Sequence, residues 1–272
     1  MEFFIAVVTI FLLGFIVYML AAHFISSVIE PFYIAAFQKP LYVHFYLSPK
    51  KLPDTQRLLL NNRFAFYRRL SEKRKGYFDH RVSQFLTQYA FHGKDGLVVT
   101  EEMRLMVAAT YVMLTFGFRV YRFGVFDKII LYPDSYESTL HDRMHNGEFN
   151  PAVKAIVFSW KHFLEGHESS SDNLNLGIHE FAHVVHFYGL QRKDNGAALF
   201  AHRFERLVQE VNHPPNKNRL MESAYFRNYA FTNSFEFVAV MLEHFFETPQ
   251  DFKRTFPQLY DHVRIMINYN EN

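Results

Sequence analysis

Residues 173–189 read NLNLGIHEFAHVVHFYG and contain the pattern His-Glu-x-x-His. The spacing of the apolar residues predicts a helix that packs on one side and carries its chemistry on the other. The packing side consists of Leu174, Ile178, Phe181 and Val185, and the opposite side of His179, His183 and His186. Ser170, Ser171 or Asp172 is expected to cap the start of this helix, and Gly189 to end it.

Two histidines one helical turn apart can reach a single metal ion without bending the backbone, and His179 and His183 have this spacing. Glu180 is rotated by about 100° around the helix axis, so it is expected beside the ion as general base for the attacking water. The alternative is a helix whose histidines contact ordinary polar partners, because a five-residue pattern also arises by chance. The chain has no cysteine, so any metal ligand must be His, Asp or Glu.

A second helix is predicted to supply a third ligand. It begins near Asn233 or Ser234, and its interior from Phe235 to Leu242 is apolar except for Glu236, which is typical of a buried helix. A buried carboxylate is unfavourable unless it is paired or binds a metal, which favours Glu236 as ligand. The alternatives are a capping-box role for Glu236 and solvent exposure for Glu243, which lies on the same face. Two His, one Glu and a water form a known catalytic zinc set.

The composition favours one sizeable globular domain with an extra segment. The chain has 272 residues, of which 49% are hydrophobic and 18% aromatic, and it has no cysteine for a disulfide framework. The formal net charge of +2 gives no argument for nucleic acid as a partner.

Residues 3–22 are almost wholly apolar, and no charged residue lies between Glu2 and Glu30. About 20 such residues span a bilayer core as a helix. A cleaved signal peptide, the alternative, would have a positive start and an apolar run of only about 7 to 15 residues. All 29 Lys and Arg follow residue 30, so the positive-inside rule predicts a single-pass anchor in the inner (cytoplasmic) membrane with the C-terminal part in the cytoplasm.

Three regions are therefore expected: an anchor over 1–30, an extended linker over 31–54 and a domain over 55–272. Between Lys50 and Lys75 there are nine basic residues and only two acidic ones. The favoured interpretation of this cluster is a solvated helix surface, and the alternative is contact with anionic lipid.

Other segments predict a helix and a small sheet within the domain. Thr100 is expected to cap a helix, and residues 127–133 and 155–160 have the branched and aromatic content of strands. If the second strand lies at an edge, it could pair with an extended peptide. Residues 133–151, which include a second histidine pair at His141 and His145, are predicted to form a surface loop.

Several motifs resemble the Mlc titration factor A family of zinc-dependent peptidases, which are of the gluzincin type. The motifs are LVVTEEMRLM at 97–106, VFSW at 157–160, NLNLGIHEFAH at 173–183 and EFVAVMLEHFF at 236–246. They occur in the family's order and cover about residues 55–265. The resemblance implies an α+β zincin-like metallopeptidase domain, mostly helical with a small sheet, similar also to the catalytic domain of anthrax lethal factor.

The resemblance also implies roles for individual residues. The family's metal ligands match His179, His183 and Glu236, and its catalytic glutamate matches Glu180. A family tyrosine near the scissile carbonyl matches Tyr229, and a further glutamate that orients a ligand histidine matches Glu243. Two features depart from the family: His186 stands where relatives usually have Asp, and the chain begins with an apparent membrane anchor.

These observations predict a membrane-anchored metallopeptidase that uses Zn²⁺ to hydrolyse a peptide or protein substrate. The alternative is a regulatory binding protein that sequesters a transcriptional repressor, with the zinc partly structural. A decayed peptidase is a third interpretation, which the complete set of ligand and base residues argues against.

Overall fold

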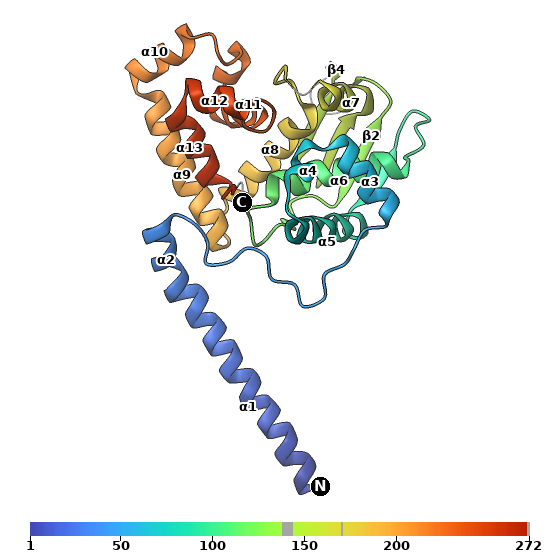
Figure 1. The fold of residues 1–272 in the computed structure, drawn as a ribbon, viewed down its shortest axis with the longest axis vertical. Coiled ribbons are helices and arrows are strands. Elements are labelled where there is room, and N and C mark those ends of the chain that lie inside the picture. The colour runs from blue at the N-terminus through green and yellow to red at the C-terminus, as the bar shows by residue number, and fades with distance from the viewer. Residues whose placement is uncertain (138–143, 170, 271–272) are drawn as a thin grey trace.

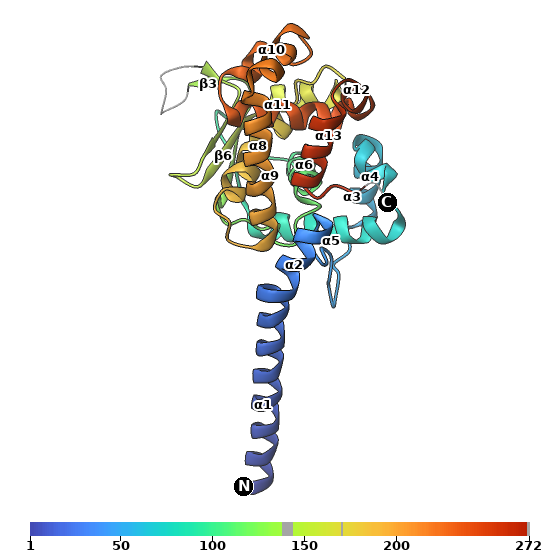
Figure 2. The same ribbon diagram turned by 90° about the vertical axis from the view of Figure 1, so that its left-hand side faces the viewer.

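The structure is a computed structural model that describes residues 1–137, 144–169 and 171–270. A long N-terminal helix extends away from a mostly helical domain that contains a four-stranded sheet (Figure 1 and Figure 2). The predicted α+β class is therefore confirmed.

The N-terminal helix is longer than the sequence predicts. It consists of α1 (Glu2–Phe24), a π-helical turn η1 (Ile25–Ile29) and α2 (Glu30–Phe37). Together they form a helix of 36 residues that is long and apolar enough to cross a membrane, and no residue of α1 is buried. Pro31 does not end the helix: it directly follows the π-helical turn η1 and lies in the first turn of α2. The extended segment therefore begins only at Gln38.

The sheet has the strand order β1 (Ala90–Gly93), β2 (Lys128–Tyr132), β6 (Ala155–Ser159) and β5 (Gly147–Asn150). The first three strands are parallel, whereas β5 pairs antiparallel with β6. The two predicted strands, β2 and β6, are confirmed. The second of them, β6, is not an edge strand and so cannot pair with an extended peptide, because it is buried along its whole length between β2 and β5.

The prediction of a surface loop over 133–151 is also wrong. This segment contains β5 and a two-stranded pair of β3 (Tyr136–Glu137) and β4 (Met144–His145). Strands of two residues show no detectable periodicity, and β5 is defined by its pairing with β6. His145 lies in β4, whereas His141 lies outside the described residues.

The domain's other elements are helices. They are α3 (Asp54–Arg63), α4 (Ala65–Arg69), α5 (Glu72–Gln88), α6 (Glu101–Thr115), α7 (Trp160–Glu168), α8 (Leu176–Gly189), α9 (Asn195–Asn212), α10 (Pro214–Glu222), the 3-10 turn η2 (Asn228–Phe231), α11 (Ser234–Glu247), α12 (Pro249–Thr255) and α13 (Pro257–Met266). Thr100 caps α6 as predicted, because its hydroxyl accepts from the backbone N–H of Met103 at 3.2 Å.

Helix α8 occupies the centre of the domain. It packs against α6, α7 and β5 on one side and against α9 and α11 on the other (Figure 1). Because α8 contacts elements that precede it and elements that follow it in the chain, residues distant in sequence converge on it.

Candidate metal centre

Helix α8 begins later than predicted. Its cap is Asn175, whose side chain accepts from the backbone N–H of Ile178 at 3.0 Å, so the predicted caps are wrong. Asp172 instead accepts from the N–H of Leu174 in the turn before the helix. Leu174 therefore precedes α8 and is 57% exposed, although the rest of the predicted apolar side is buried.

Gly189 is the last residue of α8, but it ends the helix without a left-handed conformation. A Cβ atom at this position would lie 2.2 Å from Cδ1 of Phe200 on α9. The glycine is therefore required by the close packing of α8 against α9.

The structure brings His179, His183 and Glu236 together. One potential ligand atom from each lies within 4.8 Å of the others. Nε2 of His179 is 3.0 Å from Oε2 of Glu236, and Nε2 of His183 is 3.7 Å from the same oxygen. Asn233 caps α11 through the backbone N–H groups of Phe235 and Glu236, which leaves the Glu236 carboxylate turned toward the histidines of α8.

This donor set fits a divalent metal. Two imidazoles and one carboxylate match the ligand chemistry of catalytic zinc sites, which leave a position open for water or substrate. Burial alone would raise the pKa of Glu236, but its hydrogen bond with His179 and the neighbouring histidines lower it. The carboxylate is thus held in the ionised form that a metal ligand needs.

The second nitrogen of His179 is also engaged. Its Nδ1 lies 2.7 Å from Oε1 of Glu243, which is 1% exposed, so the alternative of solvent exposure for Glu243 is wrong. Burial alone would lower the pKa of His179, but its hydrogen bonds with Glu236 and Glu243 raise it to about 10. Burial lowers the pKa of His183 to about 4, and the charge on His179 adds to this effect.

Arg227 is a site residue that the sequence analysis missed. It pairs with both carboxylate oxygens of Glu243, at 3.0 Å between Nη2 and Oε1, and it also donates to the carbonyl of Asn173. A continuous series of hydrogen bonds therefore runs from Arg227 through Glu243 to His179. No local pattern marks Arg227, since its partners lie 16 and 54 residues away.

Glu180 is 6% exposed and lies against the edge strand β5. Burial raises the pKa of Glu180 to about 7, although a hydrogen bond from the backbone of Phe149 opposes this rise. A Cβ atom at Gly147 would lie 2.7 Å from Cγ of Glu180 and 2.9 Å from its Oε1. Gly147, which the sequence analysis also missed, therefore leaves the space that the carboxylate occupies.

Tyr229 lies in η2 and is 50% exposed. Its ring centroid is 6.0 Å from that of His179, and its hydroxyl lies close enough to the Glu236 carboxylate for this group to raise its pKa. Partial burial raises the pKa of Tyr229 to about 12, and the charge of Glu236 raises it further, so the hydroxyl keeps its proton at neutral pH. It can therefore donate a hydrogen bond at the side of the metal group that faces solvent.

His186 is fully buried among aromatic rings. Its ring centroid is 4.1 Å from Phe235 and 4.2 Å from Phe204. Neither ring nitrogen has a hydrogen-bond partner within the described part of the chain. Burial lowers the pKa of His186 to about 3, so the imidazole is neutral at physiological pH.

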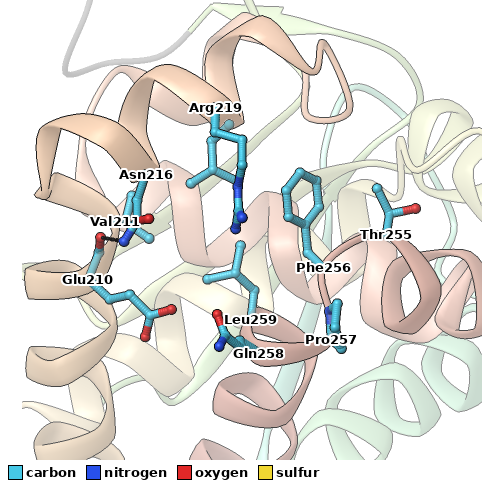
Figure 3. Close-up of a pocket in the computed structure, with 10 residues that line it drawn as sticks. Glu210, Val211, Asn216, Arg219, Thr255, Phe256, Pro257, Gln258 and Leu259 are labelled. Carbon is cyan, nitrogen blue, oxygen red and sulfur yellow. Dashed lines mark hydrogen bonds between the residues drawn. The ribbon is translucent and has the colours of Figure 1, made fainter.

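A separate cavity of about 370 Å³ lies between α9, α10, α12 and α13 (Figure 3). Its lining includes Leu259 and Phe256 together with the polar side chains of Glu210 and Arg219. Neither the metal group nor Glu180 contributes to its walls, so it is distinct from the candidate metal centre.

A central helix that presents two histidines to a carboxylate from a second helix, within an α+β domain, defines a metallopeptidase-type domain. The family described as "Glucose-regulated metallo-peptidase M90" matches residues 44–266, and the chain belongs to this family. An uncharacterized protein of Synechocystis sp. is 26% identical over 242 residues, which cover 80% of this chain and 85% of that protein. Mlc titration factor A of Yersinia pestis is 25% identical over 198 residues, which cover 66% of this chain and 72% of that protein. The resemblance inferred from the motifs is thereby confirmed.

Proposed function

We propose that this chain is a membrane-anchored zinc metallopeptidase that hydrolyses peptide bonds. The observation that carries the proposal is the convergence of His179, His183 and Glu236 within 4.8 Å, with Glu180 buried on the same helix as the two histidines. Membership of a metallopeptidase family supports the assignment.

In this proposal His179, His183 and Glu236 hold the ion. When bound, zinc would polarise the scissile carbonyl and lower the pKa of the attacking water. Glu180 takes the proton from this water on its carboxylate and transfers it to the leaving amine. Burial raises the pKa of Glu180 to about 7, and a cation held by the ligands would lower it, so the carboxylate can accept the proton of the water at neutral pH.

Other side chains position these groups or stabilise charge. The Tyr229 hydroxyl donates a hydrogen bond to the oxyanion that forms at the scissile carbonyl. Glu243 accepts the Nδ1 proton of His179, which leaves Nε2 free to bind the metal. Arg227 neutralises the buried charge of Glu243.

Peptide hydrolysis by the full-length chain, compared with Glu180→Gln, tests the assignment. The native chain is expected to cleave peptides, whereas the variant should retain zinc and lose turnover. Turnover by Glu180→Gln would refute the role of Glu180 as base. If Glu236→Ala, purified in the same way, holds as much zinc as the native chain, Glu236 is not a metal ligand.

We also propose that the N-terminal helix anchors the chain in the cytoplasmic membrane, with regions over 1–30, 31–54 and 55–272 acting as anchor, linker and catalytic domain. The proposal rests on the apolar helix and on the positions of the 29 Lys and Arg residues, all of which follow residue 30. Protease protection of inverted membrane vesicles tests it, since digestion of the domain is expected from the cytoplasmic side only.

A second candidate function is regulatory binding. It is favoured by the name of one relative, Mlc titration factor A, which describes the titration of another protein. In this case the domain would sequester a transcriptional regulator at the membrane. Binding of a regulator that is unaffected in Glu180→Gln, together with zinc-loaded protein that cleaves no peptide, would favour this function over proteolysis.

A further inference from the structure

The segment between α2 and α3 carries exposed apolar side chains that the fold does not use. Phe45 is 71% exposed and Leu47 is 92% exposed, although the neighbouring His44 and Tyr46 contact the domain. In both views this segment lies below the domain, on the side from which α1 extends (Figure 1 and Figure 2). Single exposed apolar residues are common on protein surfaces, so the contacts and charges around these two must decide whether they have a role.

The conformation of this segment is fixed by its inward-facing residues. The ring of His44 stacks on Tyr77 with centroids 4.7 Å apart, and the hydroxyl of Tyr46 accepts from Nε of the buried Arg81 at 2.6 Å. Because inward and outward residues alternate, anchoring His44 and Tyr46 to the domain turns Phe45 and Leu47 away from it.

The end of the segment is held in the same way. The backbone N–H of Lys50 donates to Nδ1 of His80 at 2.9 Å, and Leu52 is buried in the core. The outward apolar pair is therefore presented by a loop that is tied to the domain on both sides.

The anchor helix is joined to the same face of the domain. Glu30 is 1% exposed and pairs with Arg119, and its Oε2 accepts from Nδ2 of Asn195 at 2.8 Å. Its Oε1 accepts from the backbone N–H of Leu41, and Nε of Arg119 donates to the carbonyl of Tyr42. The contacts of Glu30 therefore connect the anchor, the loop and the domain.

The charge of the segment matches an anionic membrane surface. Residues 38–53 contain Lys39, Lys50 and Lys51 and no acidic residue. All three lysines are exposed, and none forms an ion pair with any residue that the structure describes. Lysines beside apolar side chains suit the boundary between acyl chains and anionic headgroups.

We propose that residues 41–51 form a second membrane contact, in which Phe45 and Leu47 enter the interface of an anionic bilayer and Lys50 and Lys51 face the headgroups. This contact would attach the domain to the bilayer at a second point, in addition to the anchor helix that Glu30 joins to the domain. The inference rests on the proposed membrane anchor, so its test reports on the anchor separately.

The absence of native cysteine allows single-site labelling of the full-length chain. Leu47→Cys is labelled with a polarity-sensitive fluorophore and reconstituted in phosphatidylcholine vesicles with or without phosphatidylglycerol, and quenching by nitroxide-labelled lipids is measured. Leu13→Cys in α1 is the membrane-inserted control, and Met221→Cys, which is exposed on the distant helix α10, is the solvent control.

We expect lipid quenching at residue 47 to lie between that at 13 and that at 221, and to increase with phosphatidylglycerol. Adding Lys50→Gln and Lys51→Gln should remove that increase. Quenching at 13 with none at 47 would overturn the loop contact and leave the anchor intact, whereas no quenching at either site would overturn both. A label at 47 that is shielded but not quenched by lipid would indicate a protein partner and would also overturn the proposal.

Discussion

Oε1 of Glu243 lies 2.7 Å from Nδ1 of His179, on the opposite side of the imidazole from the nitrogen that faces Glu236. A carboxylate that accepts the Nδ1 proton fixes the tautomer and orientation of the ring and makes Nε2 a better ligand. Glu243 is 1% exposed and pairs with Arg227.

Removing this charge should weaken metal binding. We expect Glu243→Gln to lower zinc affinity by about 10- to 100-fold, because the orienting hydrogen bond loses its charged acceptor. Competition with a chromogenic chelator measures the affinity. Arg227→Met should act in the same direction, whereas Arg219→Met on α10 should have no effect. Native affinity in Glu243→Gln would show that the contact does not tune the metal.

A side chain at Gly147 should displace the proposed base. Its Cβ would lie 2.7 Å from Cγ of Glu180, so we expect Gly147→Val to lose most peptidase activity while retaining zinc. Zinc content and peptide turnover, measured on the same sample, separate these effects. The matched control is Gly76→Ala, because a Cβ at this position in α5 meets no atom within 4 Å. Full activity in Gly147→Val would mean that Glu180 need not occupy its observed position.

The pH dependence of kcat/KM should report the ionisation of Glu180. A general base acts in its deprotonated form, so activity is expected to rise with pH through the pKa of this group. That pKa is raised to about 7 by burial, and a cation bound nearby would lower it, so the midpoint is expected at or below about pH 7. A rising limb that is centred well above pH 7 would assign it to another group.

The buried His186 should make the fold sensitive to acid. Its pKa is lowered to about 3 in the folded state by burial, whereas an imidazole in the unfolded chain has a pKa of about 6.5. Between these two pKa values only the unfolded chain binds the proton. The contribution of neutral His186 to the free energy of unfolding is therefore complete above about pH 6.5 and is lost as the pH falls. The loss is about 1.4 kcal/mol per pH unit.

Urea unfolding between pH 6.5 and pH 4.5 tests this expectation. The free energy of unfolding of His186→Leu should fall less steeply with acidification than that of the native chain, by roughly 1.4 kcal/mol per pH unit. His202→Leu, at an exposed position on α9, should leave the slope unchanged. Equal slopes for the native chain and His186→Leu would show that this imidazole is protonated in the folded state.

Local patterns predicted the elements that carry the metal group. The apolar side of α8 and the spacing of His179 and His183 depend only on helical geometry, and the start of α11 at Ser234 follows from the cap at Asn233. The start of α8 was misplaced because several polar residues precede it, and only the packed structure selects Asn175 among them. The short strands β3, β4 and β5 were missed for a related reason, since they are defined by their pairing partners.

By itself, the sequence determined that an apolar helix precedes a domain in which one helix presents two histidines and another carries two glutamates on one face. The tertiary structure alone decided which partners these groups meet. His179 and Glu243 are 64 residues apart in the chain, and neither Arg227 nor Gly147 belongs to a periodic pattern that points to Glu243 or Glu180. Periodicity reports which side of an element is buried, whereas the neighbour on that side is set by how α8, α11 and β5 pack together.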